Sequence, residues 1–341
     1  MKQIKRYGTI GPACSDPDTL ARLFEKGMTG VRINLSHTTL PKAKEWLEHV
    51  REAHQRLAYG SKPEILIDLQ GPELRIGELP TRVLKEGEMI SFVPTHTERR
   101  GDKTDIPIPL LVQKELRKGQ RVLLDDGKLA LLVEKKEGKK VLCSVLRGGT
   151  LKSGKSIALP ETEAELATLT ESDLANLAVA REYGVTGVML PFVRGKEDLI
   201  CLRRALEEAN AGEIRIFAKL ENRKGVEKLT EILPYCDEVV IARGDLGNDM
   251  PLWELPVMQA QIARRCRQEK KPFLVVTQML ASMERNAVPT RAEVSDIFRA
   301  VSEGASSVML TGETAVGHYP VEAMEYLTNT VKKAQEYFCN D

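Results

Sequence analysis

Residues 215–247 read RIFAKLENRKGVEKLTEILPYCDEVVIARGDLG, and this stretch decides the fold. Two apolar runs, Arg215–Leu220 and Glu238–Arg243, lie on either side of an amphipathic segment, Gly225–Leu233. Neither run alternates between apolar and polar residues, which is typical of strands that are covered on both faces. Strand, helix and strand in this order predict one unit of a parallel α/β sheet.

The same unit recurs along the chain. We predict strands at Ile4–Ile10, Gly30–Leu35, Glu64–Leu69, Gly187–Val193, Arg215–Leu220, Glu238–Arg243, Pro272–Gln278 and Ser306–Leu310. We predict helices at Thr19–Lys26, Lys42–Leu57, Glu171–Tyr183, Lys196–Ala209, Gly225–Leu233, Leu252–Lys270, Arg291–Glu303 and Pro320–Phe338. This order, with polar residues after almost every strand, favours a closed (β/α)₈ TIM barrel over a doubly wound open sheet.

A segment of a different kind interrupts the third unit. Short, alternating, β-rich runs such as EGEMISFVP (86–94) and KGQRVLLDD (118–126) follow the third strand. We expect a small β-barrel-like domain at 76–161, inserted into a barrel made of residues 1–75 and 162–341. Barrel active sites lie at the carboxyl ends of the strands, so an insert there is expected to act as a lid. A purely decorative insertion is the alternative.

The composition argues against several classes of protein. Lys and Arg number 50 against 49 Asp and Glu, so a protein that coats nucleic acid is not expected. No stretch reaches the roughly 20 apolar residues of a membrane span, and the first residues do not resemble a signal peptide. The cysteines are scattered without metal-ligand spacing, which favours a reduced, cytoplasmic protein.

Two carboxylates follow neighbouring predicted strands. Glu221 and Asp245, with substrate oxygens and water, would suit Mg²⁺ or Mn²⁺, which prefer oxygen ligands. Lys219 lies two residues before Glu221, so both side chains should point to the same side of the strand. A lysine at a metal site supplies positive charge where a phosphoryl group moves. A purely structural Lys–Glu pair is the alternative.

Other strand ends carry groups that suit anions or a cation. Arg32 and Arg75 could bind phosphate oxygens through paired hydrogen bonds. Asn34, Ser36 and Asp68 offer several oxygens with one charge, which suits a monovalent cation. Taken singly, each fits a turn or a helix cap equally well.

Two further features are ambiguous from the sequence alone. The run Gly244–Gly247 precedes a predicted helix start, where exposed backbone N–H groups favour an anion. In the insert, Lys152 and Lys155 are either solvated charges or lysines that fold onto nucleotide phosphates.

Taken together, the strand-end motifs closely resemble those of the pyruvate kinase family. The motifs are TIGPAC (9–14), VRINLSH (31–37), DLQGPELRIG (68–77), LLDDGKL (123–129), LKSGKSIALP (151–160), FAKLENRKG (217–225), VVIARGDLG (239–247), VVTQMLASM (275–283), VPTRAEVSD (288–296) and MLTGETAVGHYP (309–320). They occur in the family's order over nearly the whole chain. The resemblance implies transfer of the phosphoryl group of phosphoenolpyruvate to ADP, which gives pyruvate and ATP in glycolysis.

The resemblance also implies roles for residues at the substrate. Glu221 and Asp245 would bind Mg²⁺, and Lys219 would stabilise the transition state. Arg32 would contact the substrate phosphate. Gly244, Asp245 and Thr277 would line the phosphoenolpyruvate site, and Thr277 with Thr311 would belong to the water relay that protonates the enolate.

Cation and nucleotide contacts are implied in the same way. The potassium site would consist of Asn34, Ser36, Asp68 and the backbone carbonyl of Leu69. The nucleotide contacts would be Arg75, Lys155 and Asn34.

The chain departs from the family pattern at position 73. Members that require K⁺ usually read DTKGPE here, and K⁺-independent members usually read DLQGPK, whereas this chain reads DLQGPE (68–73) followed by Ile76. A lysine at position 73 could replace the charge of the cation, but Glu73 cannot, so we predict a K⁺ requirement. At a second departure, Pro191 has neither a hydroxyl nor an N–H, so a hydrogen bond made there by the usual serine must be absent or replaced.

Most family members continue into a C-terminal domain that binds effectors. We expect it to be absent here, and we therefore expect no activation by fructose 1,6-bisphosphate at such a site. The expected assembly is a homodimer formed through barrel helices.

Two other functions fit part of the sequence. A Mg²⁺-dependent barrel lyase or aldolase could share the metal carboxylates and enolate chemistry, but it would not need the β-rich insert or Lys155. A paralogue without activity could keep the barrel, but Arg32, Lys219 and Glu221 would then have no reason to be present together.

Overall fold

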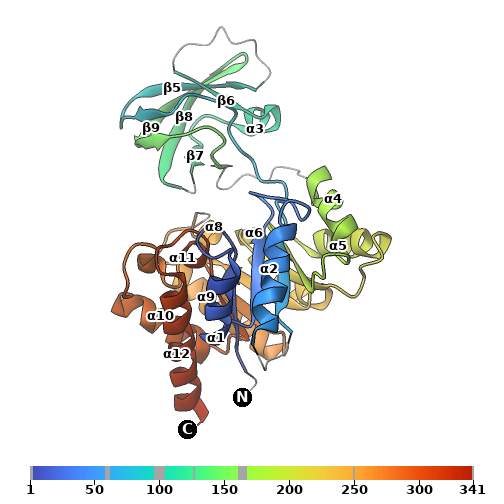
Figure 1. Cartoon of the computed structure of the whole chain (residues 1–341). Coiled ribbons are helices and arrows are strands. Elements are labelled where there is room, and N and C mark those ends of the chain that lie inside the picture. The colour runs from blue at the N-terminus through green and yellow to red at the C-terminus, as the bar shows by residue number, and fades with distance from the viewer. Residues whose placement is uncertain are drawn as a thin grey trace. The chain divides into compact units, whose positions relative to one another are not determined.

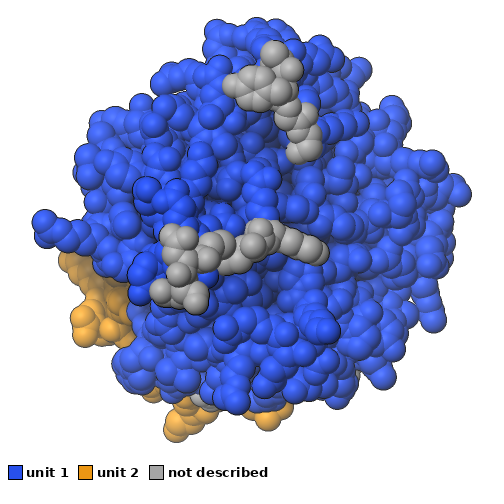
Figure 2. Space-filling view, turned by 90° about the horizontal axis from the view of Figure 1, so that it is seen from below, with its two compact units in different colours: residues 1–71, 168–341 blue, residues 72–167 orange. Residues whose placement is uncertain are grey.

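The computed structural model describes residues 3–57, 62–95, 104–125, 127–159, 167–248 and 250–339. The chain divides into two compact units (Figure 1). Unit 1 consists of Met1–Gly71 and Thr168–Asp341, and unit 2 is Pro72–Ala167; Figure 2 colours unit 1 blue and unit 2 orange. Unit 2 is therefore an insertion into the chain of unit 1, and each unit has a hydrophobic core of its own.

In the part of unit 1 that the structure describes, eight parallel strands close into a barrel. The strands, in barrel order, are β1 (Lys5–Thr9), β2 (Gly30–Asn34), β3 (Glu64–Asp68), β12 (Gly187–Leu190), β13 (Arg215–Leu220), β14 (Glu238–Ala242), β15 (Phe273–Val276) and β16 (Ser307–Leu310). The predicted TIM barrel is confirmed. Its interior is filled by buried side chains such as Tyr7, Phe217 and Leu274, so the barrel is a packed core rather than a pore.

Helices such as α2, α10 and α12 surround the strands (Figure 1). The helices of unit 1 are α1 (Pro17–Glu25), α2 (Lys44–Gln55), α4 (Glu171–Val179), α5 (Lys196–Glu208), α6 (Arg223–Glu227), α7 (Leu229–Ile232), α8 (Arg243–Asn248), α9 (Leu255–Gln268), α10 (Arg291–Ser302), α11 (Gly312–Ala315) and α12 (Pro320–Cys339). Amphipathic patterning explains the long ones, since Leu20 and Leu23 of α1, for example, are fully buried. No helix within the described ranges has both the length and the apolar character needed to cross a membrane.

Two predicted helix boundaries were wrong. The single helix expected at Gly225–Leu233 is two short helices, α6 and α7, because the backbone leaves helical geometry at Lys228. Helix α6 begins earlier than expected because the Asn222 side chain caps it, accepting a hydrogen bond from Gly225 N at 2.8 Å. The run Gly244–Gly247 does not precede a helix but lies within one, α8.

Unit 2 is built mainly of β-strands. They are β4 (Arg82–Leu84), β5 (Met89–Pro94), β6 (Asp105–Ile108), β7 (Arg121–Leu124), β8 (Leu129–Glu137), β9 (Lys140–Arg147), β10 (Gly149–Leu151) and β11 (Ile157–Ala158), with one short helix, α3 (Leu110–Glu115), in the described part. The main sheet has the order β11-β7-β8-β9-β5-β6, and β4 pairs with β10. Most neighbours are antiparallel, whereas β5 and β6 are parallel. The β-rich character predicted for this insert is confirmed.

Candidate active site

Asp68, the last residue of β3, is the centre of a buried ionic cluster. Arg32 donates to its Oδ2 from Nη2 at 2.5 Å and from Nε at 3.2 Å. The Lys219 ammonium contacts both oxygens, at 3.0 and 3.1 Å. Arg32 comes from the neighbouring strand β2, whereas Lys219 comes from β13, beyond β12, so barrel closure is what brings these two cations to one carboxylate.

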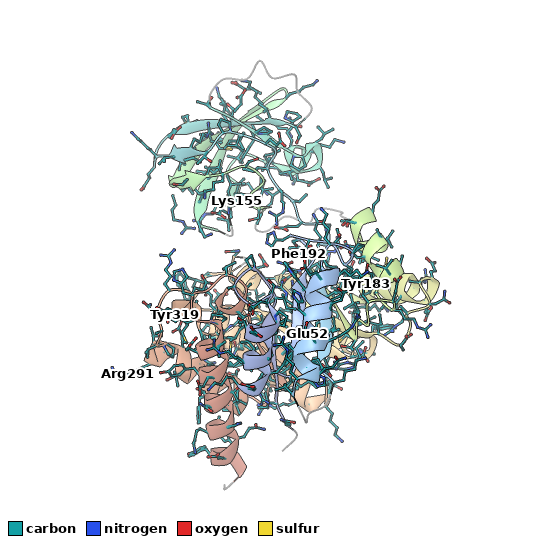
Figure 3. All side chains as sticks on the ribbon, in the orientation of Figure 1. Glu52, Lys155, Tyr183, Phe192, Arg291 and Tyr319 are labelled. Atoms are coloured by element: carbon teal, nitrogen blue, oxygen red, sulfur yellow. The ribbon has the colours of Figure 1, made fainter. Side chains whose placement is uncertain are left out.

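Glu221 extends the cluster on the other side of Lys219. Its Oε1 lies 2.9 Å from Lys219 Nζ, which confirms that the two side chains point to the same side of the strand. Its Oε2 accepts a hydrogen bond from the backbone N–H of Phe192 at 2.8 Å. Phe192, labelled in Figure 3, directly follows Pro191 and has a left-handed backbone conformation with φ 53°. A backbone N–H directly after Pro191 thus holds the Glu221 carboxylate.

The charges of this cluster are stabilised by one another. Burial alone would raise the pKa of Asp68, but the charges and hydrogen bonds of Lys219 and Arg32 hold it below its ordinary value. Burial alone would lower the pKa of Lys219, but the carboxylates of Asp68 and Glu221 raise it above its ordinary value. Lys219 therefore stays protonated and Asp68 stays ionised at neutral pH.

Gly244 and Thr277 lie side by side at the ends of β14 and β15. A Cβ at Gly244 would come 3.0 Å from the Thr277 methyl group, so a larger residue there would displace Thr277. Thr277 and Gln278 both have positive φ, 78° and 55°, which is costly for a β-branched residue such as threonine. Asp245, next to Gly244 in α8, carries its carboxylate at the first turn of that helix.

Glu313 organises the neighbouring strand end. Its Oε2 accepts from the backbone N–H of Thr311 at 2.7 Å and from the Thr311 hydroxyl at 3.2 Å. Its Oε1 accepts from Leu280 N at 3.0 Å, three residues after Thr277. A single buried carboxylate therefore fixes both loops that carry the candidate relay threonines.

The candidate cation ligands follow two adjacent strands. Asn34 and Asp68 are paired in register across β2 and β3. The Asn34 side-chain oxygen accepts from Ser36 N at 3.2 Å, and Leu69 N donates to Met189 O at 3.1 Å. All four predicted positions thus lie at or directly after the ends of these two strands.

The candidate nucleotide residues Arg75 and Lys155 belong to unit 2. Arg75 donates to Glu73 Oε2 at 2.7 Å and to the carbonyl of Gly154 at 2.8 Å, beside Lys155. Lys155, labelled in Figure 3, lies 2.8 Å from Asp125. It lines a hollow of about 440 Å³ with Lys128, Lys152 and Thr150 among its other walls. Unit 2 therefore brings several lysines around one open cavity.

A carboxylate that the sequence did not single out fixes the chain on both sides of the insertion. Asp173 Oδ1 accepts from Gln70 N at 2.9 Å, and Oδ2 accepts from Gly71 N at 3.1 Å. Oδ2 also accepts from Thr170 N at 2.9 Å and from the Thr170 hydroxyl at 2.8 Å. Asp173 is fully buried, so these hydrogen bonds satisfy carboxyl oxygens that have no water contact.

The donor set suits a divalent ion that takes few ligands from the protein. Within the described ranges, no three His, Cys, Asp or Glu side chains are grouped as a metal site. Mg²⁺ keeps several waters and is commonly held by one or two carboxylates plus substrate oxygens. Glu221 fits that pattern, because its carboxylate accepts one hydrogen bond on each oxygen and still has lone pairs for a metal. Asp245, in the first turn of α8, is the second predicted carboxylate.

The chain is similar to known proteins over nearly its whole length. The family model described as "Pyruvate kinase, barrel domain" matches residues 1–324. A pyruvate kinase of Bacillus licheniformis is 35% identical over 340 residues, which cover 98% of this chain and 58% of that protein. Pyruvate kinases of Thermococcus litoralis and Corynebacterium glutamicum are 36% and 37% identical, each over 98% of this chain and 70% of the relative. The chain thus spans between about half and three quarters of the length of these relatives.

Proposed function

The chain belongs to the pyruvate kinase family, and from this premise we propose that it transfers the phosphoryl group of phosphoenolpyruvate to ADP, the glycolytic step that gives pyruvate and ATP. The observation that carries the proposal is the convergence of Arg32 and Lys219 on Asp68, with Glu221 beside them. A phosphotransferase needs positively charged groups that are fixed in place and little covalent chemistry, and this cluster fixes two such groups, Arg32 and Lys219.

Lys219 stabilises the phosphoryl group during transfer. Its ammonium is held between Asp68 and Glu221, so it is already in place and needs no reorganisation when charge develops on the phosphoryl oxygens. Arg32 binds the substrate phosphate. Its bonds to Asp68 and to the Thr9 hydroxyl, at 3.3 Å, use three N–H donors, and the guanidinium has five.

Glu221 and Asp245 hold Mg²⁺, or Mn²⁺, beside Lys219. When bound, such an ion neutralises charge on the phosphoryl oxygens. The chain's own contribution is to fix Glu221, through Lys219 and the Phe192 N–H, so that the carboxylate is oriented before any ion arrives.

K⁺ binds to Asn34, Ser36, Asp68 and the carbonyl of Leu69. The requirement for it follows from Glu73, which is paired with Arg75 at 2.7 Å. Because this pair is neutral overall, position 73 contributes no spare positive charge that could replace the cation.

ADP binds through Arg75, Lys155 and Asn34, and unit 2 serves as the lid. The lysine-lined hollow around Lys155 supports this role, because clustered ammonium groups attract phosphates. After phosphoryl transfer, the enolate takes a proton at its methylene carbon. Thr277, with Thr311 nearby along the ordered loops, supports the water relay that delivers it, and Gly244 with Asp245 lines the same site.

We also propose a homodimer formed through barrel helices. Leu252 and Trp253, just before α9, and Val257, in its first turn, are 71%, 80% and 57% exposed, an unusual concentration of exposed apolar surface. A second copy of the chain is the proposed partner. Light scattering should give twice the chain mass, and Trp253→Glu should give the monomer mass.

One assay separates this function from its rivals. Pyruvate formation from phosphoenolpyruvate is followed with and without ADP, and ATP is measured in the same samples. A phosphotransferase makes both products only when ADP is present. Pyruvate without ADP dependence would instead indicate a lyase or phosphatase, and no pyruvate at all would indicate a protein without this activity.

A further inference from the structure

Thr277 has a backbone conformation that its own sequence does not favour. Its φ of 78° and that of Gln278, 55°, lie in the left-handed region, where a β-branched residue is rare. Residues persist in such conformations only where the surroundings impose them, and such places cluster at functional sites. The contacts that hold the backbone of Thr277 and Gln278 in this conformation are therefore candidates for a functional role.

Arg243 is one side chain that holds the backbone at Thr277. Its Nε and Nη2 both donate to the Thr277 carbonyl, at 3.2 and 2.7 Å, so two N–H groups of one planar guanidinium hold one oxygen. Nη2 also approaches the sulfur of Met279 at 3.1 Å. Arg243 begins α8, directly before Gly244, which itself packs against Thr277.

Arg243 is fixed in turn by two outer helices. Its Nη1 lies 2.5 Å from Asp296 of α10 and 3.5 Å from Gln259 of α9. Gln259 donates to Glu303 at 2.7 Å, which ties α9 to α10. The Arg243 side chain is 12% exposed, and its N–H donors are directed at protein acceptors. Because these donors are already used within the protein, Arg243 does not serve as a phosphate-binding arginine.

We propose that Arg243 is a positioning residue that aims the Thr277 hydroxyl for protonation of the enolate, and that Asp296 holds Arg243 in place. This inference rests on the proposed function. In the step concerned, a C–H bond forms at the methylene carbon, an O–H bond of the relay breaks, and solvent returns the proton to the relay. Arg243 touches neither substrate nor proton, so its loss should affect this step more than phosphoryl transfer.

The test compares the two steps in one set of variants. Loss of methyl protons from pyruvate in D₂O, in the presence of ATP, Mg²⁺ and K⁺, is followed by NMR, and ATP formation from phosphoenolpyruvate and ADP is measured separately. Arg243→Lys keeps the charge but cannot donate two hydrogen bonds to the Thr277 carbonyl in the planar geometry of a guanidinium. Its ratio of exchange to phosphoryl transfer should fall about tenfold, a part of what positioned proton transfer contributes.

Arg203→Lys is the matched control. Arg203 also donates to backbone carbonyls, those of Gly212 and Ile214, and also pairs with an aspartate, Asp237, but it lies at the opposite ends of the strands. Its ratio should equal that of the wild type. Asp296→Asn, which keeps Arg243 itself, should lower the ratio in the same direction and provides a second variant if Arg243→Lys does not fold.

Equal losses in both steps, or no loss in either, would overturn the positioning role. If the wild type makes ATP normally and the variants keep its ratio of exchange to phosphoryl transfer, this inference alone is overturned. A wild-type protein that makes no ATP would overturn the proposed function, and this inference with it.

Discussion

Replacing Lys219 with methionine removes one ammonium group and keeps most of the length of the side chain. The wild-type ammonium lies 2.9 to 3.1 Å from the oxygens of Asp68 and Glu221. Since the side chain is 13% exposed, water can replace little of what is lost. The substitution therefore tests the fixed charge itself rather than the packing around it.

The expected loss of activity follows from Coulomb's law. A unit charge about 3 Å from a phosphoryl oxygen contributes roughly 5 kcal/mol at an effective dielectric constant of about 20. Asp68 and Glu221 offset part of this, so we expect about 4 kcal/mol, which corresponds to a roughly 10³-fold lower kcat. Losing one partner of a buried ion pair lowers the free energy of unfolding by about 3 to 5 kcal/mol. Because Arg32 still neutralises Asp68, we expect the loss not to exceed this range and the fold to survive.

The assay is the ADP-dependent formation of pyruvate, with circular dichroism to confirm folding. Lys271→Met is the control, because Lys271 is a partly buried lysine that donates to the carbonyl of Cys236 at 2.6 Å, at the amino-terminal end of β15. It should lower the melting temperature but leave kcat within about twofold of the wild type. A folded Lys219→Met protein with a tenth or more of the wild-type kcat would refute the assigned role.

Three further predictions concern other parts of the structure. Replacing K⁺ with a bulky organic cation should abolish most activity, and Glu73→Lys should restore part of it in K⁺-free buffer; equal wild-type rates in both buffers would contradict the proposed cation site. Asp173→Asn removes an acceptor from the amides of Gln70 and Gly71 and should cost about 1 to 3 kcal/mol, with faster hydrogen exchange at those two amides than elsewhere in the barrel; unchanged exchange there would be inconsistent with the anchoring role. Asp198 is buried, which alone would raise its pKa, but hydrogen bonds from Arg194 and Thr168 hold the pKa below its ordinary value. Its stabilisation should therefore be complete above about pH 5 and disappear as the pH falls below about 4, so wild type and Asp198→Asn should differ in urea stability at pH 7 and converge in acid; a constant difference would show that the carboxylate charge is not responsible.

Local pattern was enough to predict the barrel. Each strand is a short apolar run that is buried on both faces, and that pattern depends only on neighbours in the sequence. The ion pair of Lys219 with Glu221 was predictable for the same reason, because a spacing of two along one strand fixes the side. Helix boundaries were less accurate where caps decided them, as at Asn222.

The groups that hold the site in place were not predictable from local pattern. Asp173 binds backbone N–H groups about a hundred residues away, and Arg243 meets Asp296 some fifty residues later. Backbone donors such as Phe192 N–H have no side-chain signature at all. These partners are determined by barrel closure, and only the quoted run VVIARGDLG placed Arg243 near the site.

The hydrogen bonds of Asp173 also describe how the insert is attached. Its Oδ2 accepts from Gly71, where the chain leaves the barrel, and from Thr170, just after the chain returns. Two nitrogens bonded to one oxygen at 3.1 and 2.9 Å lie no more than about 6 Å apart. Unit 2 is therefore inserted between two points of the barrel chain, Gly71 and Thr170, that are close together. In this arrangement a domain can be gained, lost or exchanged without altering the barrel. A turn of a few glycines across that gap should leave a barrel that still folds, because the hydrogen bonds of Asp173 that hold the two chain ends lie within unit 1.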